Sequence, residues 1–413
     1  MMGSRESADI AKEVFEQEDQ IFANKQLLSI GHVPEPDRIV GRDDEIRDLA
    51  EQLRGAIEGY SPDNVIVYGK TGTGKSLVSK YVMGRAQDLS ESDIAVGTAY
   101  LDCSEDNTET QAVSSLAKTL NDEAETDISV PQTGLSTSKY YKRLWQILDR
   151  RYDVMMVILD EVDLMADDDL LMKLSRAEEA NKVDCHIGVI AISNKIQYAE
   201  NLNERVKSSL QHKELFFQPY DATQLREIMR NRADAFQEDV LTDDVIPLCA
   251  AFAAQEHGDA RKAIDILRHA GKIAYKNGSD VVTEEHVRDA QQLAEKDRFR
   301  ELIDGAPTQA KTALLALAEL SLNNDTEAFP TREVFKQYRV ICDAIDMDTL
   351  SERRFRDILK EQAFLGIVDV EKLNQGLAGG VTLKNRLIED PDIVREILLE
   401  DTRMSQWADD GSE

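Results

Sequence analysis

The sequence contains few of the residues that build metal sites or disulfide frameworks. Its four cysteines, Cys103, Cys185, Cys249 and Cys342, lie far apart, and no two of them form a Cys-x-x-Cys pair. The six histidines are also scattered, without the spacing of metal ligands. This pattern argues against a zinc site or a disulfide framework and favours a reduced cytosol.

Long apolar segments are absent as well. No run of 18 apolar residues occurs, and the first twenty residues are polar and charged. A helix needs about 20 apolar residues to cross a membrane, and a secretory signal needs an apolar core near its start. The sequence therefore predicts a protein that is neither secreted nor membrane-spanning, and we expect it in the cytoplasm.

Basic residues are scarce relative to acidic ones. Asp and Glu number 79 against 49 Lys and Arg, which gives a formal net charge of −30. The acidic excess is spread along the whole chain, so it is not a terminal interaction tail. A dense carboxylate surface keeps a protein soluble in a salt-rich cytoplasm, where salt screens its self-repulsion. The composition favours this halophilic interpretation over the alternative, an ordinary acidic protein.

The length of 413 residues predicts two or three domains. Residues 1–38 are expected to form a helical N-terminal extension that ends at a proline-containing entry segment. Residues 39–220 alternate helical stretches with short apolar runs, and runs without polar alternation are typical of strands buried in a parallel sheet. We therefore predict an α/β subdomain here. Its expected strands are residues 64–69, 94–102, 153–161, 186–193 and 214–220.

The rest of the chain divides into further regions. Residues 221–300 show only amphipathic helical patterns, which predict an all-α subdomain, called the lid below. Residues 305–400 show three helical stretches, followed at 364–385 by two apolar runs around a Gly-containing loop. Helices followed by a β-hairpin indicate a winged helix-turn-helix domain. Residues 401–413 form an acidic tail.

The strongest motif is VYGKTGTGKS. It matches the pattern G-x-x-x-x-G-K-[ST] through Gly69, Gly74, Lys75 and Ser76, between an apolar strand and a helical stretch. The glycines let backbone amides turn towards phosphates, and the helix N-terminus attracts negative charge. The lysine neutralises β/γ oxygens, and the serine hydroxyl can ligate Mg²⁺. The sequence therefore predicts nucleotide binding.

Further candidate residues follow later strands. Asp160 and Glu161 end the apolar strand MMVILDE, where the first is placed to hold Mg²⁺ and the second to orient or deprotonate the attacking water. Asn194 ends the next strand and can bind that water or the γ-phosphate. Arg205 precedes the following strand, and Arg261 begins a helix of the lid. An ordinary solvated arginine is the alternative for either of the last two.

These stretches together resemble those of AAA+ ATPases, and more narrowly those of the archaeal replication-initiator family related to the origin recognition complex and its helicase-loading partner. The resemblance runs from about residue 22 to 298, with a weaker winged-helix match to about 400. With the acidic composition, it indicates a halophilic archaeon. The resembling stretches are HVPEPDRIVGRDDEI, GKTGTGKS, PQTGLSTSKYYKRL, VILDEVD, AISN, LNERVKSSL, FQPYDATQLREIMRNRA and HGDARKAIDILRHAG.

The resemblance implies ATP or ADP with Mg²⁺, bound between sheet and lid, and a slow ATPase that acts as a switch. Asn194 corresponds to sensor 1, Arg205 to an arginine finger offered to a neighbouring subunit, and Arg261 to sensor 2; Glu161 completes the catalytic set. The implied metal ligands are Ser76 and Asp160. The implied nucleotide-binding residues are Val40, Gly41, Arg42, Gly69, Lys70, Thr71, Gly72, Thr73, Gly74, Lys75, Ser76, Leu77, Tyr220 and Arg232.

The family also implies binding of double-stranded origin DNA through the winged helix and through a helical insertion in the ATPase subdomain. The insertion falls near residues 104–135, but its segment 104–129 carries seven acidic residues and one lysine, so a DNA contact there stays open. Recruitment of the replicative helicase is implied too. Self-association or pairing with a paralogue on DNA, and a nucleoid-associated location, complete the expectation.

The stretch LSERRFRDILKEQ, residues 350–362, is the candidate recognition helix. Its apolar residues share one side of a helical wheel, and Arg353, Arg356 and Lys360 cluster on the other side. Asp357 interrupts this cluster, and Arg354 flanks it. Such a helix enters the major groove. We expect Arg353 or Arg356 to read a base, and Arg354 and Lys360 to touch phosphate. A merely solvated helix face is the alternative. Further backbone contacts are expected from Arg332, Lys336, Arg339, Lys384 and Arg386.

The leading interpretation is an ATP-regulated initiator that binds origin DNA and helps recruit the replicative helicase. The alternative is an ATPase-coupled winged-helix transcription regulator, although no ligand-sensor domain or repeat array is evident after residue 300. A third interpretation is a loader or remodelling ATPase whose winged helix contacts protein. All three share the predicted nucleotide site.

Overall fold

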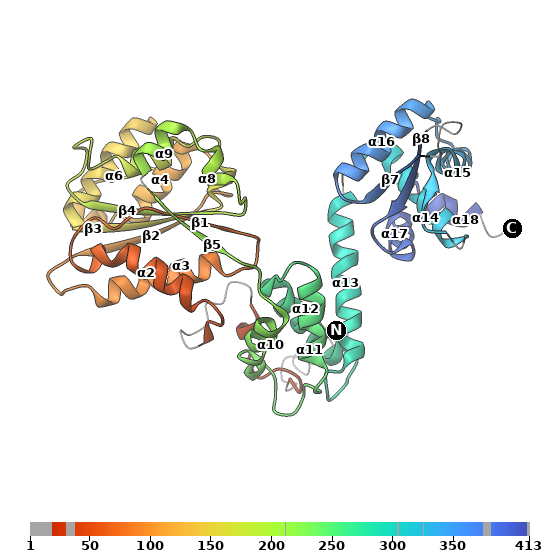
Figure 1. Cartoon of the computed structure of the whole chain (residues 1–413), viewed down its shortest axis with the longest axis horizontal. Coiled ribbons are helices and arrows are strands. Elements are labelled where there is room, and N and C mark those ends of the chain that lie inside the picture. The colour runs from red at the N-terminus through yellow and green to blue at the C-terminus, as the bar shows by residue number, and fades with distance from the viewer. Residues whose placement is uncertain are drawn as a thin grey trace, which may run out of the picture. The chain divides into compact units, whose positions relative to one another are not determined.

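The computed structural model describes residues 19–29, 38–210, 212–303, 305–324, 326–374 and 381–410. It contains two compact units, residues 1–287 and 288–413 (Figure 1). The first unit holds the sheet subdomain and the lid. The second unit holds the winged-helix domain.

Five parallel strands form the sheet of the first unit. All neighbouring strands in it are parallel. Every residue of β3 is buried, as the apolar run without polar alternation predicted. The predicted α/β class with a parallel sheet is confirmed. In spatial order the strands are β2 (Val96–Asp102), β3 (Val154–Asp160), β4 (His186–Ser193), β1 (Val65–Gly69) and β5 (Lys213–Phe217).

Helices cover both faces of this sheet. α2 (Asp43–Ile57) and α3 (Lys75–Leu89) lie on one face, and α4 (Glu109–Thr119) and α6 (Thr137–Arg151) on the other (Figure 1). Successive strand residues pack into opposite cores because their side chains alternate. The predicted insertion at 104–135 contains α4 and the short α5. The smaller elements are α5 (Glu123–Thr126), η3 (Val162–Leu164), α7 (Asp169–Ser175), α8 (Tyr198–Asn201) and α9 (Glu204–Leu210).

The lid follows β5 and is helical, as predicted. Asp221 starts its first helix through a capping box: its carboxylate accepts the backbone N–H of Gln224, whose side chain accepts the backbone N–H of Asp221. Asp259 caps a later helix by accepting two backbone N–H groups of the first turn. Both helices therefore begin at an aspartate. The lid elements are α10 (Ala222–Arg230), η4 (Ala233–Ala235), α11 (Val245–Gln255) and α12 (Ala260–Lys276).

The described N-terminal segment, residues 19–29, packs on the lid. It forms a short 3₁₀ helix, η1 (Lys25–Leu28), and a β-bridge between Phe22 and Phe236. The two rings lie 5.0 Å apart, and a Cβ on Gly271 of α12 would stand 2.5 Å from the Phe22 ring. The rest of the predicted helical extension lies outside the described residues. Residues 19–29 therefore pack as part of the lid.

The second unit is a winged-helix domain, as predicted. Its strands pair antiparallel in the order β6-β8-β7. Tyr338 and Phe355 are fully buried, with ring centroids 4.8 Å apart, and fix two helices to each other. The tip of the predicted wing, residues 375–380, lies outside the described residues. The elements are α14 (Thr308–Leu322), β6 (Phe329–Pro330), α15 (Thr331–Ala344), α16 (Glu352–Phe364), β7 (Val368–Asn374), β8 (Val381–Leu387), α17 (Pro391–Leu399) and α18 (Ser405–Asp410).

Helix α13 (Glu284–Ile303) connects the two units along the chain. The lid was expected to end at residue 300, whereas Phe299 and Ile303 pack in the core of the second unit. An ion pair also joins Arg300 to Glu400, the residue that follows α17. The helix runs through the expected boundary without a break, so its second half is part of the winged-helix domain. Like every other helix in the described ranges, it is not long and apolar enough to span a membrane.

Phe22→Ala tests the packing of the N-terminal segment. Phe22 is 4% exposed and contacts Phe236, so its truncation is expected to lower the free energy of unfolding of the first unit by about 3 kcal/mol. Urea denaturation followed by circular dichroism measures the change. Phe364→Ala is the matched control, because Phe364 is 91% exposed and its loss should cost no more than about 0.5 kcal/mol. Equal effects of the two substitutions would contradict the packing.

Candidate functional site

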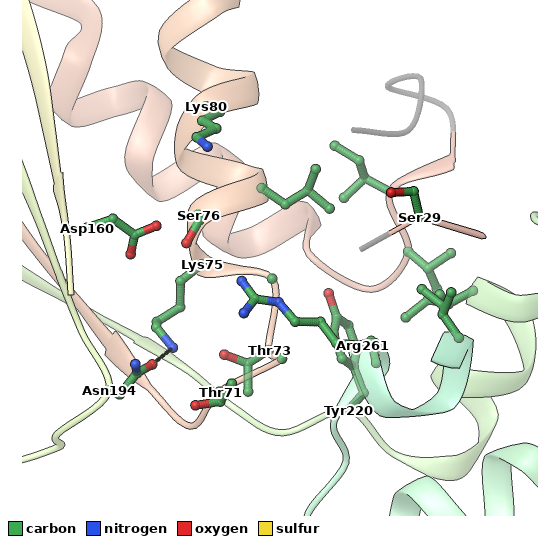
Figure 2. A pocket seen from close by; sticks show the side chains of 18 of the residues that line it. Ser29, Thr71, Thr73, Lys75, Ser76, Lys80, Asp160, Asn194, Tyr220 and Arg261 are labelled. Carbon is green, nitrogen blue, oxygen red and sulfur yellow. Dashed lines mark hydrogen bonds between the residues drawn. The ribbon is translucent and has the colours of Figure 1, made fainter. Parts of the chain in front are cut away.

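A cavity of about 460 Å³ lies between the sheet subdomain and the lid of the first unit. The loop after β1, called the P-loop, and the start of α3 line one side together with the ends of β2 and β3. Helices α10 and α12 and the N-terminal segment line the other. In Figure 2, Ser76 and Asp160 lie on the sheet side and Tyr220 and Arg261 on the lid side. The carboxyl edge of a parallel sheet is where such folds bind ligands.

Two glycines let the P-loop lie directly against the lid. Gly72 (φ +73°) and Gly74 (φ +87°) have left-handed backbone conformations. A Cβ on Gly72 would stand 1.7 Å from a carboxylate oxygen of Asp259, and one on Gly74 would stand 2.6 Å from the Tyr220 hydroxyl. The backbone N–H of Ala260 donates to the Gly72 carbonyl oxygen at 3.2 Å. The P-loop and the first turn of α12 are therefore in contact.

Lys75, the first residue of α3, is buried beneath the P-loop. Its ammonium donates to two carbonyl oxygens of the loop (2.8 Å each) and to Oδ1 of Asn194 (2.9 Å), the bond drawn in Figure 2. Burial lowers the pKa of Lys75 to about 8; the nearby Asp160 carboxylate opposes this shift, and Arg261 adds to it. The charge of this lysine therefore depends on pH in mildly alkaline solution.

Asn194 joins this lysine to the acidic residues after β3. Its Oδ1 accepts from Lys75, and its Nδ2 donates to Oε1 of Glu161 at 3.2 Å. Asp163 holds Asn194 in place, because its Oδ1 accepts the backbone N–H of Asn194 (3.3 Å) and the hydroxyl of Ser193 (2.9 Å). Glu161 itself has a left-handed backbone (φ +53°), which is strained for a residue with a side chain. Lys75, Asn194 and Glu161 thus form one hydrogen-bonded chain.

Arg42 does not line the cavity, although the resemblance assigns it to the nucleotide. Its side chain is 3% exposed and donates to the carbonyl oxygens of Thr73 (3.0 Å) and Gln218 (2.6 Å). It also pairs with Glu45 (2.9 Å), and its guanidinium lies 3.9 Å from the centroid of the Tyr220 ring. Arg42 therefore connects the P-loop, the start of α2 and the segment that enters the lid.

The other predicted arginines of the first unit occupy three different places. Arg261 extends from the start of α12 towards Ser76 (Figure 2). Arg232 lines the cavity from the lid and donates to the carbonyl oxygen of Leu27 at 2.6 Å, so it also fixes the N-terminal segment. Arg205, near the start of α9, is exposed and does not line the cavity of its own chain. Its position is accessible to a neighbouring molecule.

Most of the residues assigned to nucleotide, metal and catalysis line this one cavity. Gly69 and Lys70 contribute indirectly, because their carbonyl oxygens accept from Lys75. Those that do not line it are Gly41, Arg42, Gly69, Lys70 and Arg205. Those that line it are Val40, Thr71, Gly72, Thr73, Gly74, Lys75, Ser76, Leu77, Asp160, Glu161, Asn194, Tyr220, Arg232 and Arg261.

The residues predicted to contact DNA lie on the winged-helix domain. The apolar side of α16, with Phe355 and Ile358, is buried, so its basic side faces outward. Lys384 is half-buried on β8, and the others are exposed. The exposed set is Arg332, Lys336 and Arg339 on α15, Arg353, Arg354, Arg356 and Lys360 on α16, and Arg386 on β8.

These basic side chains differ in their availability. Arg356 pairs with Glu352 at 2.8 Å, and Arg386 pairs with Asp369 at 3.2 Å. Arg353 forms no ion pair with any residue that the structure describes. Exposed ion pairs contribute only about 0–1 kcal/mol, so they can open for a ligand. Arg353 could bind a ligand without breaking an ion pair to any described residue.

Three protein families match successive parts of the chain. Residues 59–195 match the AAA domain, residues 226–292 the Cdc6 AAA+ ATPase-type lid domain, and residues 301–397 the CDC6 C-terminal winged helix domain. These stretches fall on the sheet subdomain, the lid and the winged-helix domain. The order of the three matches is the order of the observed domains.

Relatives match over nearly the whole chain. The chain is 70% identical over 394 residues to the ORC1-type DNA replication protein 4 of Halobacterium salinarum, which covers 95% of this chain and 96% of the relative. This chain belongs to the Orc1/Cdc6 family. It is also 46% identical to the ORC1-type DNA replication protein 9 of Haloarcula marismortui, over 94% of each chain. The Aeropyrum pernix ORC1 protein, solved in complex with DNA, matches at 34% identity and a TM-score of 0.72, covering 95% of this chain and 100% of that one.

The cavity of this Orc1/Cdc6 protein has lining residues that the sequence analysis missed. Tyr100 and Asp102 could have been found, because they end a predicted strand of the same parallel sheet, whose carboxyl ends share one edge. Lys80 lies one turn after Ser76 on α3 and so faces the same side. No comparable signal marks Ser29, which is distant in sequence. The full missed set is Ser29, Arg38, Ile39, Lys80, Tyr100, Asp102, Ser104, Ile228, Ala260 and Ile264.

The cavity of the Orc1/Cdc6 protein fits a nucleotide with Mg²⁺. The P-loop amides, the N-terminus of α3 and Lys75 form an anion site. Ser76 and Asp160 point towards the same space beside it (Figure 2), and such oxygen ligands suit Mg²⁺. The described residues contain no cluster of three or more acidic, His or Cys side chains that could hold a metal. Apolar surface for a base comes from Ile39, Val40, Ile228 and Ile264.

The lowered pKa of Lys75 predicts that nucleotide binding by this Orc1/Cdc6 protein weakens in alkaline solution. Free Lys75 loses its proton around pH 8, whereas bound polyphosphate favours the charged form and raises that pKa. Binding above pH 8 therefore takes up a proton, and affinity should fall by up to about tenfold per pH unit. Calorimetry in buffers of different ionisation enthalpy should count roughly 0.5–1 proton per ADP at about pH 8.5. An uptake near zero would contradict the shift.

Proposed function

We propose that this protein is an ATP-binding DNA replication initiator that recognises origin DNA, with its nucleotide state acting as a switch. The observation that carries the proposal is the presence, in one Orc1/Cdc6 chain, of a cavity that fits a Mg²⁺-nucleotide and a winged helix with a basic outer side. Relatives over nearly the whole chain are named DNA replication proteins, and one matching structure contains DNA. The alternative, a transcription regulator, is not favoured because these relatives match across all three domains.

The residues of the cavity have distinct proposed roles in binding ATP. Bound Mg²⁺ would supply electrostatic stabilisation of the phosphate oxygens. Ser76 and Asp160 would hold the ion, and Lys75 would exchange its contact with Asn194 for phosphate oxygens. Arg261 approaches the same phosphates from the lid, where it lies within the cavity. The nucleotide is thus held from both subdomains.

Glu161 is the proposed general base for slow hydrolysis. Its Oε1 accepts from Nδ2 of Asn194, which leaves Oε2 to take a proton from a water molecule. Asn194 also accepts from Lys75, so any movement of Lys75 towards phosphate alters the contact that orients Glu161. This dependence supports a switch in which turnover follows the state of the phosphates.

The lid is the proposed reader of the nucleotide state. The backbone N–H of Ala260 donates to the Gly72 carbonyl oxygen, and Asp259 packs against Gly72. Burial raises the pKa of Asp259, although backbone N–H groups of the helix and nearby cations oppose this. A change in the P-loop is thus transmitted directly to α12.

DNA recognition is proposed to depend on short-range contacts. If the cytoplasm contains about 1 M salt, the Debye length is about 3 Å, and counterion release adds little to affinity. Base contacts and DNA shape must then carry more of the binding. Arg353, which forms no ion pair with the described residues, is the first candidate base reader on α16, and Arg356 the second.

Two partner interactions complete the proposal. Recruitment of the replicative helicase is proposed because the resemblance to replication initiators implies it. Self-association, or pairing with a paralogue on DNA, is supported by Arg205, which is exposed on α9 away from the cavity of its own chain. In that arrangement Arg205 would reach the phosphates of a neighbouring copy, where an arginine stabilises developing charge.

Glu161→Gln tests the role of the proposed base. The amide keeps the size of the side chain but cannot accept the proton, so ATP affinity should stay within about threefold of wild type while turnover falls at least about 100-fold. Lys75→Ala serves as the reference, because removal of its charge should abolish binding. Filter binding and phosphate release measure the two quantities. Normal turnover by Glu161→Gln would refute the assignment.

Arg353→Ala and Lys360→Ala test the proposed division of roles on α16. Loss of a base reader should cost about 1–3 kcal/mol at the origin repeat and reduce discrimination against a scrambled repeat. Loss of a phosphate contact should weaken both DNAs equally and reduce the salt dependence. Fluorescence anisotropy across salt concentrations measures both, with Arg47→Ala on α2 as the matched surface control. Full discrimination by both Arg353→Ala and Arg356→Ala would exclude these two residues as readers.

A further inference from the structure

Two residues of the cavity, Tyr100 and Lys80, have no role in the proposed function. The hydroxyl of Tyr100 donates to Oδ2 of Asp160 at 2.9 Å. The other oxygen, Oδ1, accepts the backbone N–H of Glu161 at 3.0 Å. Asp160 is 7% exposed, so bulk water does not readily replace either donor. Each oxygen of this carboxylate is therefore held by one donor, and the two donors come from different segments of the chain.

The register of the sheet explains how Tyr100 reaches this carboxylate. Strands β2 and β3 are parallel, with Tyr100 opposite Ile158 and Asp102 opposite Asp160. Alternate residues of a strand share a face, so Tyr100 lies on the same face as the strand end that carries Asp160. The length of the phenol spans the offset of two residues between Ile158 and Asp160 along the neighbouring strand. A serine or threonine at this position would be too short to do so.

Lys80 of α3 restrains the ring of Tyr100. Its ammonium lies 3.4 Å from the ring centroid, where the ring quadrupole attracts a cation. A tyrosine hydroxyl keeps its proton at neutral pH and can donate it to a carboxylate, as the hydroxyl of Tyr100 does to Asp160. The ring is thus held between a helix and a strand end, with its polar atom directed at one carboxylate oxygen.

We propose that Tyr100 is a positioning residue for the Mg²⁺ ligand Asp160. By holding Oδ2, its hydroxyl keeps the carboxylate in one orientation, so that the lone pairs not used by Tyr100 and Glu161 remain directed at the ion. Lys80 acts through Tyr100 by restraining the ring. Hydrogen-bond partners of metal ligands typically change metal affinity by about 10- to 100-fold. This inference rests on the proposed function, because it assumes that Asp160 binds the metal.

Tyr100→Phe removes the hydroxyl and keeps the ring beside Lys80. Binding of a fluorescent, non-hydrolysable ATP analogue is measured in EDTA and through a Mg²⁺ titration. We expect affinity in EDTA within about twofold of wild type and a Mg²⁺ concentration for half-maximal tightening raised about tenfold. Tyr141→Phe is the matched control: its hydroxyl donates to a carboxylate, Glu109, at 2.9 Å, but neither residue lines the cavity. It should change neither quantity.

A double substitution separates positioning from direct contact with the nucleotide. If Tyr100 acts through Asp160, Tyr100→Phe should add no further change in an Asp160→Asn background. An additive effect, or an equal loss of affinity in EDTA and in Mg²⁺, would overturn the proposal. If the wild type depends on Mg²⁺ and Tyr100→Phe responds to Mg²⁺ as the wild type does, the role of Tyr100 is refuted and the metal role of Asp160 is not. A wild-type protein without any Mg²⁺ response would remove the metal role of Asp160 and this inference together.

Discussion

The contact between the P-loop and the lid depends on the absence of a side chain at Gly72. Asp259 occupies the space that a Cβ would fill, and the backbone of Ala260 bonds to the same glycine. On the other side of the loop, Lys75 donates to Asn194, which in turn donates to Glu161 at the acidic end of β3. One short loop is therefore bonded to both halves of the cavity. Any ligand that displaces the loop must change the contacts of both halves at once.

The fold was largely predictable from the sequence because its signals are local. The strands are short apolar runs, the P-loop motif lies between a strand and a helix, and both were found at the expected residues. The role of Arg42 was not predictable: its position suggests a nucleotide contact, whereas its buried bonds reach Thr73 and Gln218. Tyr100 could have been expected at the edge of the sheet, but its hydrogen bond could not. Its contact with Asp160 depends on the pairing of β2 with β3, which no local pattern encodes.

The overall charge of this protein provides no long-range attraction to DNA. The chain carries a formal net charge of −30, and acidic residues also outnumber basic ones in the winged-helix domain. The basic side of α16 is presented because its apolar side, including Phe355, is buried in the domain core. Binding must therefore begin with a close geometric fit. Non-specific DNA, which offers charge without that fit, should compete poorly.

The packing of the N-terminal segment on the lid has a consequence for the connectivity of the first unit. Phe22 pairs with Phe236, and Leu27 accepts a hydrogen bond from Arg232. The whole sheet subdomain lies between these partners along the chain, so it is an insertion between two parts of the lid. During synthesis the early segment has no partner until the ribosome has made the lid helices. Completion of the lid is thus a late step that brings together residues far apart in the sequence. All of the sheet subdomain lies in the chain segment between them.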